Sequence, residues 1–311
     1  MRRIPKFVII ALVVSLGFAA WPQKLYAEEG PKVVISPAEI DLDLDPGEST
    51  SFKLTVVNTS SIDRTFEVKL RSFDEGGKAG EPVLDDTIET PLHEWLQLPT
   101  STIQVTSQSH IVYEVNLSIP LSARPGSYRT VLLFRDTEVH TDVNGSIISA
   151  EFGPFIFVKV NGKLVEQAEI LNFQAKQVIN ESLPVAFTTL ISNQGNVDIV
   201  PRGTINIRPL YSLNTQQRNF DFNPTLSRTL ADSQRVYTSE WIDGANWQIG
   251  YYEAEIVFAY SDSNKVLTTK TNFWIIPWKV LIVILIIVTC GFTFSVHRSR
   301  RKSNRTPKPA K

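Results

Sequence analysis

The feature that most constrains this 311-residue chain is an apolar run near its C-terminus. Val280–Val296 is 17 residues long, carries no charge, and contains twelve Leu, Ile, Val or Phe residues. At about 1.5 Å per residue, this run and the apolar residues before it can cross a hydrocarbon layer of about 30 Å as a helix. We therefore expect a single transmembrane helix at 274–296, with the rest of the chain folding outside the bilayer.

Residues on both flanks of this run are predicted to anchor it and to set its orientation. The residues after it include several arginines and lysines but no acidic residue, which predicts a basic cytoplasmic tail at 297–311. Tryptophan rings prefer the membrane interface, and a lysine there can extend its ammonium group towards water. The predicted membrane-interface anchors are Trp274, Trp278, Lys279, Arg298, Arg300 and Arg301.

The N-terminus predicts that the middle of the chain is exported. Three basic residues among the first six precede a 14-residue apolar stretch, Phe7–Ala20, and Ala27 is the small residue that a cleavage site requires. We expect a signal peptide at 1–27, with an uncleaved signal anchor as the alternative. Either one gives a cell-membrane protein with a single pass and an extracellular N-terminal ectodomain.

The exported part is acidic and has no cysteine. The chain has 31 basic and 32 acidic residues; four basic residues precede Glu28 and eight begin at Lys279, which leaves 19 bases against 32 acids and a net charge of −13. Nucleic-acid binding is therefore disfavoured. Because the only cysteine, Cys290, lies in the predicted span, the ectodomain must be stabilised by packed cores and not by disulfides.

Short alternating segments separated by turn residues fill the exported part. Thr50–Asn58, Thr65–Phe73 and Ile111–Ile119 each alternate apolar and polar residues, which is typical of strands with one buried face. Asn144-Gly145 is the strongest hairpin signal among the turns. Such short strands with frequent turns predict an all-β fold made of antiparallel β-sandwiches.

Internal similarity predicts two copies of this plan, in tandem immunoglobulin-like domains at 28–162 and 163–273. In both halves a glycine is followed two residues later by a tyrosine that begins a long strand, which suggests a tyrosine packed at a strand corner. A further match links the apparent openings of the two halves. The paired segments are Gly126–Tyr128 with Gly250–Tyr252, Thr55–Asn58 with Thr189–Asn193, and Ala38–Ile40 with Ala168–Ile170.

No pattern predicts catalysis, a cofactor or a small-molecule substrate. His93, His110 and His140 are scattered, with no second ligand at metal-binding spacing, and no exported thiol exists. The chain also lacks a nucleophile elbow, a phosphate-binding glycine loop and a helical zinc motif. We therefore expect a protein without catalytic or metal-binding residues.

Two other motifs have a structural and a functional interpretation. Asp41, Asp43 and Asp45 resemble the start of a calcium loop, but proline stands where that loop needs glycine, which favours an edge strand with outward charges. Trp241 and Trp247 could form a carbohydrate platform, although packing in a core or loop is the commoner use of such rings.

These segments resemble a known family of bacterial proteins. The likeness extends over the whole architecture and rests on Ile35–Ser60, Tyr113–Phe134, Phe152–Gly162 and Thr189–Ile207. It is to membrane-anchored surface proteins of the WxL-interacting type, and it implies a peptidoglycan-binding immunoglobulin-like domain followed by a second one that binds a partner. A weaker likeness, to the first domain of pilus chaperones, rests on the same opening segment.

Three classes of function follow from the sequence. The favoured class is a non-enzymatic cell-surface binding or scaffold protein, with peptidoglycan or another surface protein as its partner. The alternative is a membrane-tethered chaperone or assembly factor that adds a strand to exported proteins, which requires an unpaired edge strand in the first domain. An enzyme acting on carbohydrate or cell wall is disfavoured, because no paired acid and base can be identified.

Overall fold

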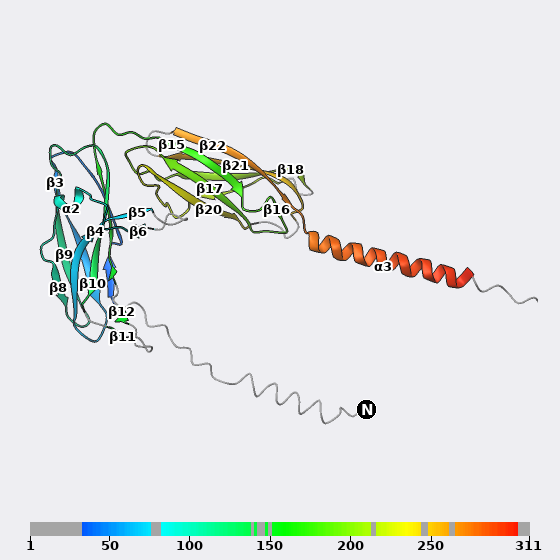
Figure 1. The fold of residues 1–311 in the computed structure, drawn as a ribbon, viewed down its shortest axis with the longest axis horizontal. Helices are drawn as coiled ribbons and strands as arrows, with labels where there is room; N and C mark the ends of the chain where they lie inside the picture. The colour runs from blue at the N-terminus through cyan, green and yellow to red at the C-terminus, as the bar shows by residue number, and fades with distance from the viewer. Residues whose placement is uncertain are drawn as a thin grey trace, which may run out of the picture.

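Two β-sandwiches follow one another along the chain, and a helix leaves the second one (Figure 1). The structure is a computed structural model that describes residues 33–75, 82–137, 140–141, 147–148, 151–212, 216–243, 248–260 and 265–303. The predicted signal peptide, 1–27, lies outside these residues. The architecture confirms the predicted fold class of two immunoglobulin-like sandwiches with a C-terminal helix.

The first sandwich packs a four-stranded sheet against a larger one. The order of the first sheet is β1-β3-β9-β7, and that of the second is β2-β14-β10-β4-β8, with β13 beside β10. β2 pairs parallel with β14, and the other pairs are antiparallel. The bounds are β1 Val33–Ser36, β2 Glu39–Leu44, β3 Ser49–Asn58, β4 Arg64–Arg71, β7 Leu96–Gln97, β8 Thr102–Val105, β9 Ser109–Ser118, β10 Gly126–Asp136, β13 Glu151–Phe152 and β14 Phe155–Val160.

Three small elements extend this sandwich. One strand pair, β5 Phe73–Glu75 with β6 Pro82–Leu84, lies towards the second sandwich. Another, β11 His140–Thr141 with β12 Ile147–Ile148, is antiparallel and encloses the predicted Asn144-Gly145 turn, whose residues lie outside the described part. A one-turn helix, α2 Leu92–Trp95, packs Leu92 and Trp95 into the core.

The second sandwich repeats this plan with fewer strands. A three-stranded sheet of order β15-β17-β20 faces a five-stranded sheet of order β16-β22-β21-β18-β19. β16 pairs parallel with β22, as β2 does with β14. The bounds are β15 Ala168–Ala175, β16 Ile179–Asn180, β17 Val185–Asn193, β18 Arg202–Ser212, β19 Arg218–Phe222, β20 Ser233–Trp241, β21 Gly250–Tyr260 and β22 Lys265–Ile275.

The apolar residues that alternate with polar ones in the sequence are the residues that the strands bury. In β4, Phe66 and Val68 are fully buried while the residues between them are partly exposed. In β9, Tyr113, Val115 and Leu117 are buried while Glu114 and Asn116 between them are exposed. Because side chains of a strand point to opposite faces in turn, each strand contributes one apolar face to the core of its sandwich.

Two features confirm the predicted repetition. Asn58 and Asn193 end equivalent strands, β3 and β17, and each buried amide group donates to three backbone carbonyls and accepts a backbone N–H two residues on. Tyr128 donates its hydroxyl to the carbonyl of Arg124, and Tyr252 bonds Ser212 and Gln248. Each hydroxyl thus reaches the residue four positions upstream, but only Tyr128 bonds a backbone carbonyl as a tyrosine corner does.

One predicted equivalence is wrong. Ala38–Ile40 leads into β2, which pairs with β14, whereas Ala168–Ile170 begins β15, which pairs with β17. The strand of the first sandwich that is structurally equivalent to β15 is β1. Each of them pairs with the strand that ends in the buried asparagine, β3 for β1 and β17 for β15. The sequence match misled because the opening strand of such a sandwich divides between two sheets.

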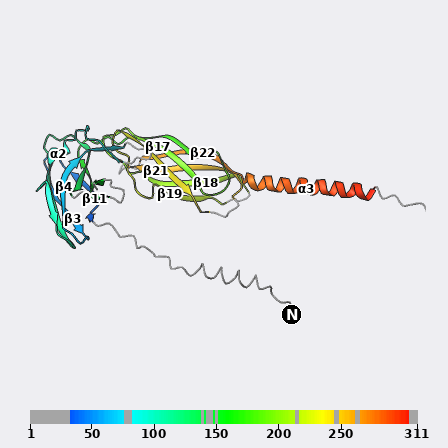
Figure 2. The ribbon, with the colours of Figure 1, turned by 60° about the horizontal axis from the view of Figure 1, so that its bottom comes forward.

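The helix α3, Trp278–Ser303, continues almost directly from β22. Only Ile276 and Pro277 separate the two elements, so α3 begins four residues after the predicted start at Trp274. Residues Trp278–Ser295 have a mean hydropathy of 2.2 and none of them is buried, which makes α3 long and apolar enough to cross a membrane. Figures 1 and 2 show that α3 leaves from the end of the second sandwich that lies away from the first.

Candidate functional site

The predicted membrane anchors that the structure describes lie together at the start of α3. Trp274 is in β22 and Trp278 is the first residue of α3, and both rings are partly exposed. Lys279 Nζ lies 2.6 Å from Glu181 Oε2, so an ion pair links α3 to the loop after β16. The remaining predicted anchors lie in the C-terminal part of α3, where only the backbone is described: Arg298, Arg300 and Arg301. Their role at a membrane stays a prediction.

A second site, which the sequence did not predict, lies where the two sandwiches meet. We call it the elbow: the outward faces of β10 and β14 and the β5–β6 hairpin, facing residues 223–235 of the second sandwich. Phe73 contacts Phe155 and Phe157 edge-on, with ring centroids 5.0 and 5.9 Å apart. Leu230, from the second sandwich, completes this buried cluster together with Val131 and Leu133. Shared apolar burial therefore holds the two sandwiches together.

Two hydrogen bonds join the start of β10 to the second sandwich. Asn196 Nδ2 donates to the carbonyl of Pro125 at 3.0 Å, and the Ser127 N–H donates to the carbonyl of Asn196 at 2.9 Å. Gly126, between them, has φ of +150°, and a Cβ there would lie 2.8 Å from the Asn196 carbonyl oxygen. Only glycine permits this approach. The glycine that precedes Tyr128 in the repeated motif is therefore also a point of contact between the sandwiches.

The loop after β19 presents the side chains of Leu226 and Arg228 to the elbow. The Asn223 side chain donates to the carbonyls of Pro201 and Ser227 and accepts the Ser227 N–H, so the loop is tied at its base. Leu226 has φ of +52° and is 53% exposed. A bulky residue in this left-handed region costs about 1–2 kcal/mol. The loop therefore keeps an exposed leucine in an unfavourable backbone conformation at the elbow.

Arg228 crosses from the second sandwich to the edge strand of the first. Its guanidinium bonds the carboxylates of Glu39 and Asp41 in β2 and lies 3.8 Å from the centre of the Phe157 ring. The arginine side chain is only 19% exposed. A planar guanidinium can make charge-assisted hydrogen bonds and stack on an aromatic face at once. Arg228 is therefore held in one position.

Two hollows lie on either side of Arg228 and Phe157. The larger, of about 240 Å³, borders the middle of β2 and includes Asp198 and Lys159. The other, of about 220 Å³, has a mixed lining in which apolar side chains alternate with polar and charged ones. Its apolar lining residues are Phe73, Pro82, Phe155, Phe157, Leu226 and Leu230.

Glu75 closes the second hollow from the β5–β6 hairpin. Its carboxylate accepts hydrogen bonds from Ser233 Oγ at 2.8 Å and from the Leu230 N–H at 3.3 Å, and lies 3.6 Å from Arg235. Burial raises the pKa of Glu75, and these partners offset only part of the shift. A nearly buried carboxylate of the first sandwich thus contacts three residues of the second.

Asp198 is a second acid of the elbow with a buried carboxylate oxygen. One carboxylate oxygen accepts the Ala231 N–H at 2.8 Å, and the other has no hydrogen-bond partner among the described atoms. Burial raises the pKa of Asp198, and the hydrogen bond from Ala231 and the charges of Arg129 and Arg228 oppose that shift. The ionised form of Asp198 is therefore unfavourable in the folded elbow.

Stability should consequently fall as pH rises through the raised pKa of Asp198. The folded chain keeps this proton at pH values where the unfolded chain has lost it, so the contribution is present at low pH and lost as the folded carboxyl ionises. Asp198→Asn should flatten this dependence and raise the unfolding midpoint at neutral pH, because an amide can replace the unpartnered oxygen with a neutral group. Thermal unfolding between about pH 4 and 8 measures this. An unchanged slope in the variant would contradict it. Glu75→Gln is a second variant that should flatten the dependence in the same direction, because burial also raises the pKa of Glu75.

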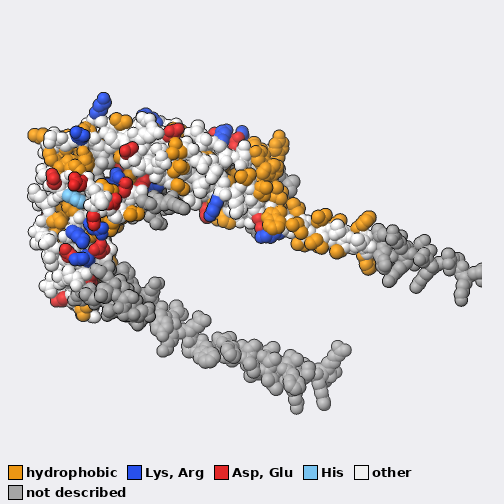
Figure 3. Space-filling model, in the orientation of Figure 1, with side chains coloured by type: hydrophobic (Ala, Val, Ile, Leu, Met, Phe, Trp, Pro, Cys, Tyr) orange, Lys and Arg blue, Asp and Glu red, His pale blue; other side chains and the backbone are white. Residues whose placement is uncertain are grey.

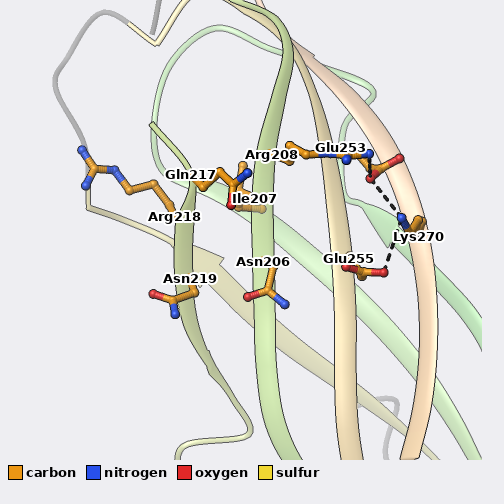
Figure 4. A pocket seen from close by; sticks show the side chains of 9 residues that line it. All are labelled: Asn206, Ile207, Arg208, Gln217, Arg218, Asn219, Glu253, Glu255 and Lys270. Carbon is orange, nitrogen blue, oxygen red and sulfur yellow. Dashed lines mark hydrogen bonds and ion pairs between the residues drawn. The ribbon is translucent and has the colours of Figure 1, made fainter. Parts of the chain in front are cut away.

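A third hollow, of about 480 Å³, lies on the outer face of the five-stranded sheet (Figure 4). Arg208 and Lys270 flank Glu253, with Arg208 Nη2 2.8 Å and Lys270 Nζ 3.3 Å from its Oε1. Lys270 Nζ also lies 3.4 Å from Glu255 Oε1. Opposite charges on neighbouring strands stabilise a sheet by a few tenths of a kcal/mol to about 1 kcal/mol each. Arg208, Lys270 and the two glutamates thus compensate one another on this surface.

The other residues that the sequence suggested as candidate sites have structural roles in the described part of the chain. β2 is an edge strand with outward Glu39, Asp41 and Asp43, as expected from the alternative to a calcium loop. No group of acids, histidines or cysteines that could hold a metal occurs in the described part of the chain. Trp241 is 2% exposed and packs in the core, while Trp247 lies outside the described residues. Because its ring is buried, Trp241 does not contribute to an exposed carbohydrate-binding platform.

Comparisons with known proteins give structural similarities but no family. No family model and no curated protein matches the chain. The Class 5 fimbriae chaperone CfaA is 11% identical, covers 78% of this chain and 98% of its own, and has a TM-score of 0.37. The Pseudomonas aeruginosa CupB2 chaperone is 11% identical over 77% of this chain and 100% of its own, with a TM-score of 0.35. The CsuC–CsuE chaperone–tip adhesion subunit complex of Acinetobacter baumannii gives 9% identity over 77% and 98%, with a TM-score of 0.38. Values this low assign neither a function nor a binding residue to this chain.

Proposed function

We propose that this chain is a non-enzymatic, membrane-anchored protein that binds an extended segment of an exported or surface polypeptide at the elbow. The observation that carries the proposal is the pair of hollows beside the fixed Arg228, one of which combines three phenylalanine side chains with polar and charged residues. Of the two functions that the sequence left open, this favours the assembly factor over a scaffold that binds cell wall.

An extended segment fits the elbow because a strand edge lies beside the hollows. β2 is the edge of its sheet, so in the described part of the chain no strand pairs with its outer side. The acids that point outward from β2 have cationic partners: Arg228 bonds Glu39 and Asp41, and Lys159 pairs with Asp43. Backbone pairing at this edge would give affinity, and apolar side chains of the segment would enter the hollows.

A second open edge supplies an internal comparison. β7 covers only Asn116 and Leu117 of β9, so residues 109–115 have no strand partner on that side among the described residues. Val112, in the middle of this edge, is 57% exposed. Strand addition at β9 and binding at the elbow are therefore distinguishable by position.

Site-specific photocrosslinking in the full-length protein tests the proposal. A photoreactive residue replaces Leu226 at the elbow, Val112 at the β9 edge, or Leu121, an 86% exposed control in the first sandwich. The expected result is a polypeptide adduct from position 226 and none from 121. Adducts from 112 alone, or retention of the protein by purified cell wall without any polypeptide adduct, would contradict binding at the elbow.

The variant Leu226→Asn should separate stability from binding. Asparagine tolerates the left-handed conformation better than leucine, so the variant should gain up to about 1 kcal/mol of unfolding free energy. It also removes an apolar lining residue, so crosslinking or capture of the partner should fall. Thermal unfolding and partner capture are measured on the same preparation. A variant that is more stable and still binds fully would show that Leu226 has no part in recognition.

A further inference from the structure

Four residues form a row across the end of the five-stranded sheet, next to α3. Strand register places Tyr211 of β18 opposite Tyr251 of β21, Tyr251 opposite Trp274 of β22, and Trp274 opposite Ile179 of β16. Side chains of directly opposed residues lie on the same face of a sheet. We call this set, Tyr211, Tyr251, Trp274 and Ile179, the aromatic row.

The aromatic row faces away from the core. Tyr211 is 78% exposed and Ile179 56%, and the Tyr251 and Trp274 rings lie 4.6 Å apart on the outside of the sheet. The adjacent positions behave in the opposite way, because Tyr252 and Phe273 stack on each other inside the core. Folding of the sandwich requires apolar side chains only at the inward positions of these strands, and polar residues would suffice at the outward ones. The outward apolar row therefore needs a further explanation.

The position of the row is fixed relative to α3. Trp274 precedes Trp278 by four residues, and its N–H donates to the carbonyl of Val178 at 2.7 Å. The Ile276 N–H donates to the carbonyl of Asn180 at 2.8 Å, so the connection to α3 is tied to the loop around β16. At most about 13 Å of extended chain separates the row from the start of the helix.

Other exposed apolar side chains extend the surface at this end. Val178 is 67% exposed beside the row. Ile242, directly after β20, is 66% exposed on the other sheet. Figure 3 shows the hydrophobic side chains gathered at the end of the second sandwich where α3 begins. The apolar surface of the sandwich is thus continuous with that of the helix.

We propose that the aromatic row is a lipid-contacting surface that places the base of the second sandwich in the interfacial region of the bilayer. The proposal rests on the membrane anchoring proposed for α3. Tyrosine and tryptophan prefer this region because their rings are apolar while their O–H and N–H groups can bond to water and headgroups. The bilayer is the occupant that the structure favours, because the row leads directly into a helix able to span it.

This contact would fix the orientation of the whole ectodomain. The Lys279–Glu181 ion pair and the aromatic row hold the sandwich against the helix and the bilayer, so the strands stand away from the membrane. β22 has eleven residues and is therefore about 35 Å long, which places the elbow at about that distance above the headgroups.

Fluorescent labelling of the full-length protein in phosphatidylcholine liposomes tests the row. The native Cys290 is replaced by serine, and an environment-sensitive probe is attached to Tyr211→Cys or to Arg202→Cys, an exposed control at the other end of the same strand. Quenching lipids carry a spin label near the headgroup or deep in the acyl chain. We expect a shift to shorter emission wavelength and headgroup-level quenching at position 211, with neither at 202.

A probe on the native Cys290 in the otherwise unchanged protein distinguishes the two proposals. Quenching of this probe by the deep spin label together with headgroup-level quenching at 211 supports the lipid contact. Deep quenching at 290 with equal signals at 211 and 202 overturns the contact of the row and leaves the anchor intact. Absence of deep quenching at 290 overturns the anchor, and the lipid contact with it.

Discussion

Asp136→Asn is expected to lower the unfolding free energy of the first sandwich by about 3–5 kcal/mol. Asp136 and Arg64 form an ion pair between β10 and β4 in which both side chains are less than a tenth exposed. Arg64 Nε also lies 3.4 Å from Ser60 Oγ, which is itself bonded to Asn58. Asparagine preserves the shape of aspartate but removes the buried negative charge that faces the guanidinium, and this accounts for the large effect.

The neighbouring pair supplies a matched control. Arg135 and Glu67 are directly opposed on the same two strands, and each is about 40% exposed. Glu67→Gln should therefore change the unfolding free energy by less than about 1 kcal/mol. Denaturant unfolding of the full-length protein measures both variants. Equal losses would refute the assignment of the effect to burial, and the double variant Arg64→Met with Asp136→Leu should recover much of the loss.

Asn193→Ala is expected to cost about 2–4 kcal/mol of unfolding free energy and also to weaken binding at the elbow. The Asn193 amide donates to the carbonyls of Val197, Thr229 and Leu230 at 2.8, 3.3 and 3.0 Å. Alanine leaves these buried carbonyls without that donor. Because Thr229 and Leu230 directly follow Arg228, the variant also loosens the segment that presents the arginine to β2.

Asn58→Ala separates the two consequences. Asn58 makes the equivalent three bonds in the first sandwich, to Ile62, Val105 and Thr106, and so should have a similar effect on stability. None of these carbonyls belongs to the elbow. Crosslinking from position 226, measured below the unfolding midpoint of both variants, should therefore fall for Asn193→Ala and persist for Asn58→Ala. An equal fall in both would indicate a general loss of stability as the cause.

The sequence predicted the fold because local signals and core burial agree. The alternation around Phe66 and Val68, the asparagine at each strand end, and the paired glycine–tyrosine motifs all depend on neighbours within one strand or turn. The start of α3 was misplaced because Trp274 is apolar and aromatic in either a strand or a membrane interface. Hydropathy does not distinguish these two environments, whereas the hydrogen bond of the Trp274 N–H does.

The elbow could not be predicted because it joins residues far apart in the chain. Arg228 and Glu39 are separated by 189 positions, and neither has a local pattern that points to the other. The outward acids of the strand beginning at Glu39 attract cationic partners, but with 19 bases in the exported part nothing in the sequence selects Arg228. Leu226 gave no signal, because a left-handed conformation at leucine is imposed by the bonds of Asn223 and is not favoured by leucine itself.

The two-residue connection between β22 and α3 has a mechanical consequence. If a partner held at the elbow is pulled away from the membrane, the force leaves the protein through Ile276 and Pro277 and acts along the axis of β22. β22 is paired with β21 over eleven consecutive residues, and antiparallel hydrogen bonds lie across the strand direction. Tension therefore loads all of these bonds together in shear, and none of them opens singly as in a peeled strand. With α3 anchored in a bilayer as proposed, the second sandwich would transmit load to the membrane without unfolding from its end.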